Sequence, residues 1–211
     1  LSEEVGNVSS YADFFNNSSN PESSVYISQM KDKMYYSEKN AEGHIQLFTK
    51  DKEGNTWSEP TPLAGLDEQD DLHQNYPFML SDGLTLYYAA KGPESIGGYD
   101  IFMTRYDADN HSFLTPENIG MPFNSPANDY LYIEDDFLNL GWFVADRNQP
   151  EGKVCIYTFI PNVTRKVYTA SSVGINKLRS YARLNSIRDT WHDKQKVNEA
   201  VERLQQIKQS S

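Results

Sequence analysis

The 211-residue chain is poor in cysteine, in long apolar runs and in basic charge, and each shortage excludes a class of protein. Its one cysteine, Cys155, can form no internal disulfide, and inside a predicted strand we interpret it as a small buried hydrophobic residue. No apolar run reaches the roughly 18 residues that a membrane-spanning helix needs. The start at Leu1, without Met or a charged-then-apolar leader, suggests a processed or trimmed boundary and leaves open a removed signal or lipid anchor.

The sequence also lacks the motifs that mark common catalytic sites. It contains no Gly-x-Ser-x-Gly elbow, no His-Glu-x-x-His, no phosphate-binding glycine loop and no cysteine pair. The four histidines stand far apart, at His44, His73, His111 and His192. We therefore predict a protein that is not an enzyme and uses no cofactor or metal.

Basic charge is scarce except at the C-terminus. Residues 1–170 carry 11 Lys and Arg against 26 Asp and Glu, whereas residues 171–211 carry 8 against 4. An acidic body argues against nucleic acid as a ligand, because phosphate binding depends on a basic surface. The basic tail could dock on an acidic face of this chain or of a partner.

Aromatic residues are plentiful, with 14 Tyr, 10 Phe and 3 Trp, and they favour half-buried strands. The stretch 76–106 shows the pattern most clearly. A Ser81-Asp82-Gly83 turn separates a short apolar strand from a strand at 84–90, and a Gly97-Gly98 bend precedes a strand at 100–106. This stretch is predicted to be an antiparallel meander.

The same order of strands occurs three times, at spacings of 52 to 55 residues. Matching positions are Tyr35, Tyr87 and Trp142 in one strand, and Gly43, Gly98 and Gly152 before the next strand. A closing fourth strand is expected within 57–63, within 113–119 and at 165–169.

Repeats of this length are typical of propeller blades. We predict a mainly β fold: a partial β-propeller of about three four-stranded antiparallel blades, followed by two C-terminal α-helices. The blades are expected at residues 24–66, 74–122 and 129–170.

Three motifs of the chain resemble a known repeat family. They are Ser81-Asp82-Gly83-x-x-Leu86-Tyr87-Tyr88, Gly97-Gly98-Tyr99-Asp100-Ile101-Phe102 and Pro116-x-Asn118-Ile119-Gly120-x-Pro122-x-Asn124-Ser125-Pro126-x-Asn128-Asp129. Together they resemble the WD40-like propeller repeat of TolB-type proteins, over roughly residues 24–170. The resemblance implies a propeller of the bacterial envelope, periplasmic or attached to the outer membrane as a lipoprotein. Fold alone does not fix function.

The two ends of the chain differ from the repeats. Residues 1–23 are rich in Ser and Asn, and we expect an irregular lead-in that donates one strand to a neighbouring blade. Residues 171–211 change to helical periodicity, which predicts two amphipathic helices. A Thr190–Asp193 pair resembles a capping box and places the start of the second helix near Trp191.

Candidate binding groups follow from the alternating strand directions, which bring one set of loops to a single face. These loops are residues 38–42, 66–75, 91–97, 121–129 and 146–152. The candidate binding residues on them are Asp70, Asp71, His73, Asn75, Asn128, Asp129 and Arg147. Tyr76 and Phe123 are the loop aromatics expected to be exposed, and Asp100 is expected to bond backbone next to its glycine turn.

Three interpretations stay open for the acidic segment 67–73. It could be a solvated loop whose carboxylates cap local amides, or a divalent cation site completed by Asn75 and Asp129. It could also supply paired carboxylates for glycoside hydrolysis. We predict a non-catalytic scaffold that binds a protein or a cell-wall ligand; the alternative is a glycan-binding protein or glycan-directed hydrolase that uses the same loops.

Three blades are fewer than the four to eight of closed propellers, so an apolar blade face needs a cover. The chain could be a piece of a longer propeller, two copies could form a six-bladed ring, or the C-terminal helices could cover the open end.

Overall fold

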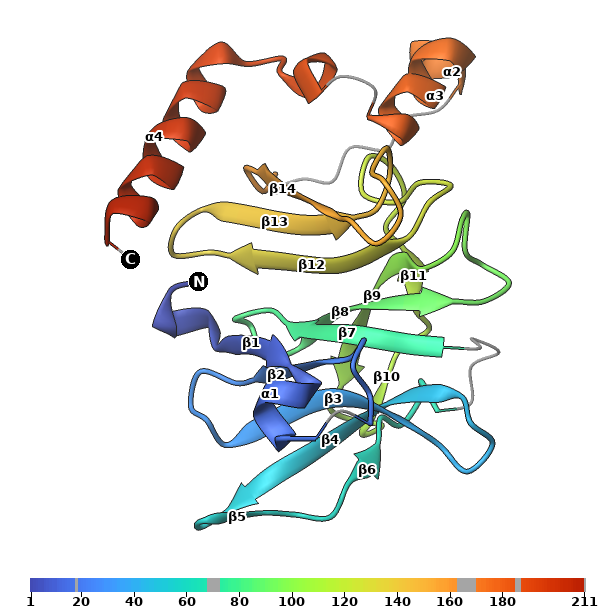
Figure 1. The fold of residues 1–211 in the computed structure, drawn as a ribbon, viewed down its shortest axis with the longest axis vertical. Helices are drawn as coiled ribbons and strands as arrows, with labels where there is room; N and C mark the ends of the chain where they lie inside the picture. Colours follow the sequence, from blue (N-terminus) through green and yellow to red (C-terminus); the bar gives the residue numbers. More distant parts are fainter. Residues whose placement is uncertain (18, 68–72, 163–169, 185–186, 211) are drawn as a thin grey trace.

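Strands hold 38% of the residues and helices 20%, so the mainly β prediction is confirmed. The computed structural model describes residues 1–17, 19–67, 73–162, 170–184 and 187–210 (Figure 1). In Figure 1 the strands of the three repeats lie roughly one above another, with the C-terminal helices at the opposite end from the first repeat.

The first repeat is an antiparallel meander of β2 (Ser24–Ile27), β3 (Lys33–Lys39) and β4 (Ile45–Glu53). Two short strands, β5 (Thr56–Trp57) and β6 (Thr61–Pro62), pair with β4 and form the expected closing edge. The closing edge is short because prolines interrupt it, and proline cannot donate to a strand ladder.

The second repeat has the same order, with β7 (His73–Met79), β8 (Thr85–Lys91) and β9 (Asp100–Asp107). Its closing edge consists of β10 (Ser112–Phe113) and β11 (Glu117–Asn118), which both pair with β9. The meander predicted from the sequence is confirmed to within a residue or two at its second and third strands.

The third repeat forms a separate sheet of β12 (Asp129–Asp135), β13 (Leu140–Ala145) and β14 (Cys155–Phe159). Cys155 is half-buried and not fully buried as predicted, because it begins a strand whose side chains are half-buried or exposed throughout. The predicted fourth strand at 165–169 lies outside the described residues.

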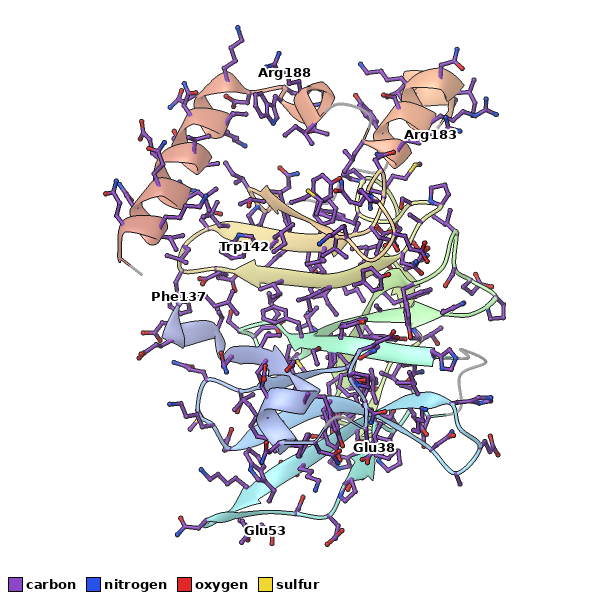
Figure 2. All side chains as sticks on the ribbon, in the orientation of Figure 1. Glu38, Glu53, Phe137, Trp142, Arg183 and Arg188 are labelled. Atoms are coloured by element: carbon purple, nitrogen blue, oxygen red, sulfur yellow. The ribbon has the colours of Figure 1, made fainter. Side chains whose placement is uncertain are left out.

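Neither sheet of the described residues closes on itself, so the propeller is not confirmed. The first two repeats are joined through a parallel bridge between Ile45 of β4 and His73 of β7. Successive repeats also pack through side chains: the Tyr26 and Phe78 rings of the first and second repeats lie 5.2 Å apart, and the Tyr87 and Tyr132 rings of the second and third lie 4.4 Å apart. Figure 2 shows side chains filling the space between the stacked sheets.

The N-terminal segment is more ordered than expected, with a 3-10 turn η1 (Glu3–Val5), β1 (Asn7–Ser10) and α1 (Tyr11–Phe15). As predicted, it donates one strand, since β1 pairs with β2. At the other end of this segment the backbone amide of Ser2 donates to Asp135 of the third repeat, at 2.7 Å. The segment therefore bridges the first and third repeats.

The C-terminal segment contains α2 (Ala170–Val173), α3 (Ile175–Arg183), a 3-10 turn η2 (Ile187–Thr190) and α4 (Lys194–Ser210). The predicted start near Trp191 was three residues early, because Asp193 and not Thr190 caps α4. The Asp193 carboxylate accepts from the amides of Gln195 and Lys196, whereas the Thr190 hydroxyl donates to the Ile187 carbonyl. Of the helices described, none is both long and apolar enough to cross a membrane.

Candidate functional site

The link between the second and third repeats is fixed by an asparagine ladder. The Asn124 side chain accepts from the Ile101 amide at 2.7 Å and donates to the Ile101 carbonyl at 2.8 Å, as a paired strand would. It also donates to Asn118 at 2.7 Å. Asn124 is fully buried, so in the motif at residues 116–129 this asparagine holds backbone together and is not available to a ligand.

Asp100 and the glycine bend form the second support of this link. The Asp100 carboxylate accepts from the Ile96 and Gly97 amides and from Asn118, which confirms the structural role expected for it. Burial raises the pKa of Asp100, and these donors oppose that rise. A Cβ on Gly97 would lie 2.4 Å from the Ala127 carbonyl oxygen, which is backbone and cannot move aside, so the bend needs glycine there.

Asp129 and Arg147, two of the predicted binding residues, form a buried ion pair. The Arg147 guanidinium also donates to the carbonyls of Pro122 and Phe123, and it lies 5.3 Å from the centre of the Phe143 ring. Burial raises the pKa of Asp129, while Arg147 and the Ser125 amide act in the opposite direction. The pair ties the link 121–129 to the loop that follows β13.

Asn75 and His73 are also used within the protein. The buried Asn75 side chain accepts from the Ser37 hydroxyl and donates to the Glu22 carbonyl at 3.1 Å. His73 accepts from the Ile45 amide at 3.2 Å through Nδ1, and burial together with His44 lowers the pKa of its ring. Asn75 and Asp129 therefore each bond neighbours of their own and do not converge on a common ligand.

The acidic pair Asp70 and Asp71 lies outside the described residues. Among the residues that the structure describes, no group of three or more His, Cys, Asp or Glu side chains could hold a metal ion. The cation site considered for segment 67–73 therefore stays a hypothesis, since Asp70 and Asp71 are not described and Asn75 and Asp129 bond other neighbours.

A cleft of about 830 Å³ is lined by residues from the first strand of each repeat, among them Ser24 of β2, Tyr76 of β7 and Tyr130 of β12. Three half-buried tyrosines line it: Tyr76 of β7, Tyr99 before β9, and Tyr130 of β12. Their ring centres lie 5.6 to 6.0 Å from one another. We call these residues the tyrosine triad.

The remaining wall of the cleft comes from the N-terminal segment and from the loop after β13. Its further lining residues are Val8, Ser9, Ser10, Pro21, Glu22, Ser23, Ser24, Asn128, Leu131, Val144, Asp146, Gly152, Lys153 and Val154. Of the predicted binding residues that the structure describes, Asn128 alone lines the cleft. Its amide and side chain donate to Asp146, at 2.8 Å each, and thereby hold the loop after β13 against the link.

Tyr76 reaches the cleft through a local distortion of β7. Its φ is +54°, a left-handed conformation that is costly for a large side chain, and the pairing of β7 with β8 shifts register between Asn75 and Phe78. The Tyr76 amide donates to the Asn75 side chain at 2.8 Å, which supports this conformation. Strain of this kind persists where the surrounding structure enforces it, often at functional sites.

The triad tyrosines are neutral hydrogen-bonding groups at neutral pH. Burial raises the pKa of Tyr130 to about 12, helped by Asp146, which accepts from its hydroxyl at 2.9 Å. Burial also raises the pKa of Tyr76 and of Tyr99. Glu22 adds to the rise at all three rings, because its negative charge lies within electrostatic reach of each hydroxyl.

Sequence reasoning named Tyr76 as an exposed aromatic, and the structure places its ring in the cleft. It missed Tyr99, Tyr130 and Glu22. A signal existed for the first two, since each directly follows a residue of the motifs described above: Tyr99 follows Gly98, and Tyr130 follows Asp129. Phe123 was wrongly expected to be exposed; it packs edge-on against Tyr132, Phe143 and Phe159.

Comparison of the chain with protein-family models, with curated proteins and with solved structures gives no match.

Proposed function

We propose that the three repeats are blades of a partial propeller and that the chain is a non-catalytic binding module of the bacterial envelope. Two features support the fold: each repeat is an antiparallel meander, and aromatic pairs join the faces of successive repeats. The periplasmic or outer-membrane location, with a possible lipid anchor, rests on the resemblance to TolB-type repeats.

The tyrosine-lined cleft carries the binding proposal. Ligand sites are concave and combine aromatic surface with a few polar groups, and this cleft offers three rings, hydroxyls and two carboxylates. It lies where the inner strands of three units begin, and a ligand there contacts every repeat at once. A protein segment or a cell-wall fragment is the ligand we propose.

A glycan ligand is the second candidate, because sugar rings stack on tyrosine and bond carboxylates and amides. Hydrolysis of a glycan would need two carboxyl groups held across the substrate at roughly 5 to 10 Å. The Asp146 carboxylate already accepts hydrogen bonds from Asn128 and Tyr130. Glu22 is therefore the cleft carboxylate that is more available to a ligand.

A ligand screen tests the proposal. The full chain is titrated with glycans, peptidoglycan fragments and envelope proteins, and each hit is repeated with Tyr99→Ala and with Phe137→Ala. Phe137 is the matched control, since its ring is 62% exposed in a turn away from the cleft (Figure 2). Binding lost only in Tyr99→Ala supports the cleft; equal binding in both variants contradicts it.

Turnover decides between the two function classes. Release of a product from any glycan, lost in an Asp70→Ala/Asp71→Ala variant, would replace the scaffold by a hydrolase. Binding without turnover in the same assay supports the non-catalytic module.

Ring closure has its own measurement. We propose that further chain or a second copy completes the ring, because the described sheets leave it open. The mass in solution at high concentration discriminates: a strict monomer removes the two-copy ring, whereas a mass of two chains supports it.

A further inference from the structure

We propose that the cleft binds an organic cation, with the tyrosine triad and Glu22 holding a primary or quaternary ammonium group. The cation could belong to a small amine or to a lysine side chain of a protein partner. This inference rests on the proposed binding function of the cleft and specifies the ligand's charge.

The aromatic surface is the first support. Ring faces carry partial negative charge, and a cation binds over a ring face when it lies within about 6 Å of the ring centre. The triad brings three tyrosines together, and all three keep partial exposure in the cleft. Tyr76 contributes its ring at the cost of a left-handed backbone, which simple packing of β7 would not require.

The carboxylate of Glu22 is the second support. It lines the same cleft on an exposed loop position, and its charge acts on the hydroxyls of all three triad tyrosines. It therefore adds negative charge to the cleft that the three rings share. Asp146, in the loop after β13, also adds negative charge to the cleft, although its oxygens accept from Asn128 and Tyr130. The acidic body, with 11 more acidic than basic residues in the whole chain, favours a cationic ligand further.

Ser24 gives an independent sign of a ligand. Only 7% of this residue is exposed, it lines the cleft, and its hydroxyl has no hydrogen-bond partner among the described residues. Buried polar atoms are nearly always bonded, so this shielded hydroxyl fits a donor that a ligand brings once the side chain turns toward the cleft. A primary ammonium can donate to Ser24 Oγ, whereas a quaternary ammonium cannot.

Lys153 is the one basic side chain lining the cleft, and it opposes the binding of a cation. It is exposed and comes from the loop after β13, so solvent screens its charge. The proposal therefore makes an additional prediction: Lys153→Gln tightens cation binding by about two- to threefold.

Matched probe pairs test the charge directly. Choline is compared with 3,3-dimethylbutan-1-ol, which has the same shape without the charge, by nuclear magnetic resonance titration of the tyrosine signals of the full chain. N-acetyl-lysine-amide is compared with N-acetyl-norleucine-amide in the same way. We expect each cation to bind about tenfold more tightly than its neutral partner. Equal binding within both pairs would overturn the proposal.

Two substitutions locate the site. Glu22→Gln should weaken the binding of both cations about three- to tenfold without changing the affinity for the neutral probes, and Tyr99→Leu should weaken the binding of both cations similarly.

A third substitution separates a primary from a quaternary ammonium: Ser24→Ala should weaken the binding of the lysine probe and leave the binding of choline unchanged. Glu53→Gln, an exposed carboxylate at the far end of β4, is the matched control (Figure 2). Equal loss in Glu22→Gln and Glu53→Gln would contradict a local site.

The outcomes also separate this inference from the proposed function. If glycan or protein ligands shift the triad signals but neither cation does, the binding function stands and the cationic ligand is wrong. If no ligand of any class shifts them, both fail.

Discussion

At the residue scale, Arg147 makes the sharpest prediction about stability. Its side chain is 3% exposed, and its guanidinium contacts Asp129, two carbonyls and the Phe143 ring. Arg147→Met keeps much of the volume but leaves a buried carboxylate and two carbonyls without their donor. We expect it to lower the free energy of unfolding by about 3–5 kcal/mol, measured by urea denaturation.

A double variant separates the contribution of the Asp129–Arg147 ion pair to stability from that of the packing of the Arg147 side chain. Asp129→Asn combined with Arg147→Met removes the uncompensated charge, and we expect it to be less destabilised than Arg147→Met alone. Arg203→Met on α4 is the control, because Arg203 donates only to the exposed Asn139 carbonyl and lies near Glu199. A double variant as unstable as the single one would show that lost packing, and not charge, dominates.

Asp82 in the turn before β8 predicts a pH dependence. Burial tends to raise the pKa of Asp82, but the amides of Thr85 and Leu84, both at 2.8 Å, outweigh it and lower the pKa. A lowered carboxyl pKa means that the charged form is favoured in the folded state, so this stabilisation is complete above about pH 5 and is lost as the pH falls through the folded pKa. Thermal unfolding should therefore show Asp82→Asn as less stable at pH 7 and nearly equal to the wild type near pH 2.

The control for Asp82 is Glu53→Gln, which changes an exposed carboxylate outside any such turn. The difference in thermal stability between Glu53→Gln and the wild type should stay near zero at both pH values. A gap between Asp82→Asn and the wild type that is the same at pH 7 and pH 2 would rule out the carboxylate charge as its cause.

The candidate site could be predicted from sequence only in part, and the reason lies at the same scale. Asn75, Asp129 and Arg147 were chosen as binding groups because polar side chains on loops are usually free to bind. In this fold they bond buried backbone and one another, which depends on distances across repeats that sequence spacing does not give. Glu22 lay in a segment expected to be irregular, so nothing in the pattern aligned it with the tyrosines.

At the element scale, the N-terminal segment depends on one glycine. Gly6 has a φ of +84°, and a Cβ there would lie 2.2 Å from the Ile27 carbonyl of β2. Gly43 has nearly the same φ, +85°, with nothing within 4 Å of a Cβ. Gly43→Ala therefore measures the backbone strain alone, about 1–2 kcal/mol.

Gly6→Ala adds a steric clash, and a ψ of −161° also forces Ala into a backbone region that only glycine adopts readily, so we expect it to cost about 2–4 kcal/mol. Hydrogen exchange should also show lost protection in β1 and at the Ser2 amide, because the bridge to Asp135 can no longer form. Equal costs for the two variants would mean that the segment shifts without penalty and does not bridge the repeats.

The elements were predictable where apolar runs stand between turn signals. The strands at 84–90 and 100–106 were found because nearly continuous apolar residues lie between Gly, Pro and Asp breakers. The 3-10 turn and the helix α1 were not, because a segment rich in Ser and Asn carries little hydrophobic pattern and is ordered by Val5 and Tyr11, which are buried against other repeats.

At the scale of the whole molecule, sequence periodicity predicted three repeats but not how they meet. The contacts between sheets depend on aromatic pairs such as Tyr87 with Tyr132, whose residues lie far apart in the chain. The same holds for the tail: periodicity predicted two amphipathic helices but not what they contact. Arg183 and Leu184, at the end of α3, touch the third repeat, since the Asn148 side chain donates to the Arg183 carbonyl at 3.0 Å.

Leu184 is the anchor of the tail. It is 8% exposed and belongs to the apolar cluster of Ile119, Tyr132 and Phe143. Leu184→Ala should therefore lower the free energy of unfolding by about 2 kcal/mol, at the low end of the range for a buried leucine. Leu114→Ala is the matched control, because half of that side chain is exposed, and it should cost less than about 0.5 kcal/mol.

A chain ending at residue 192 isolates the contribution of α4. The apolar stripe of this helix stays half-buried or exposed, and its Arg203 donates to the Asn139 carbonyl in the turn between β12 and β13. Removing α4 should therefore change the free energy of unfolding by less than about 1 kcal/mol and leave the chain soluble. If this truncation aggregates or unfolds while Leu184→Ala does not, α4 covers an apolar face of the repeats. In that case the tail is the element that closes the open end of the molecule.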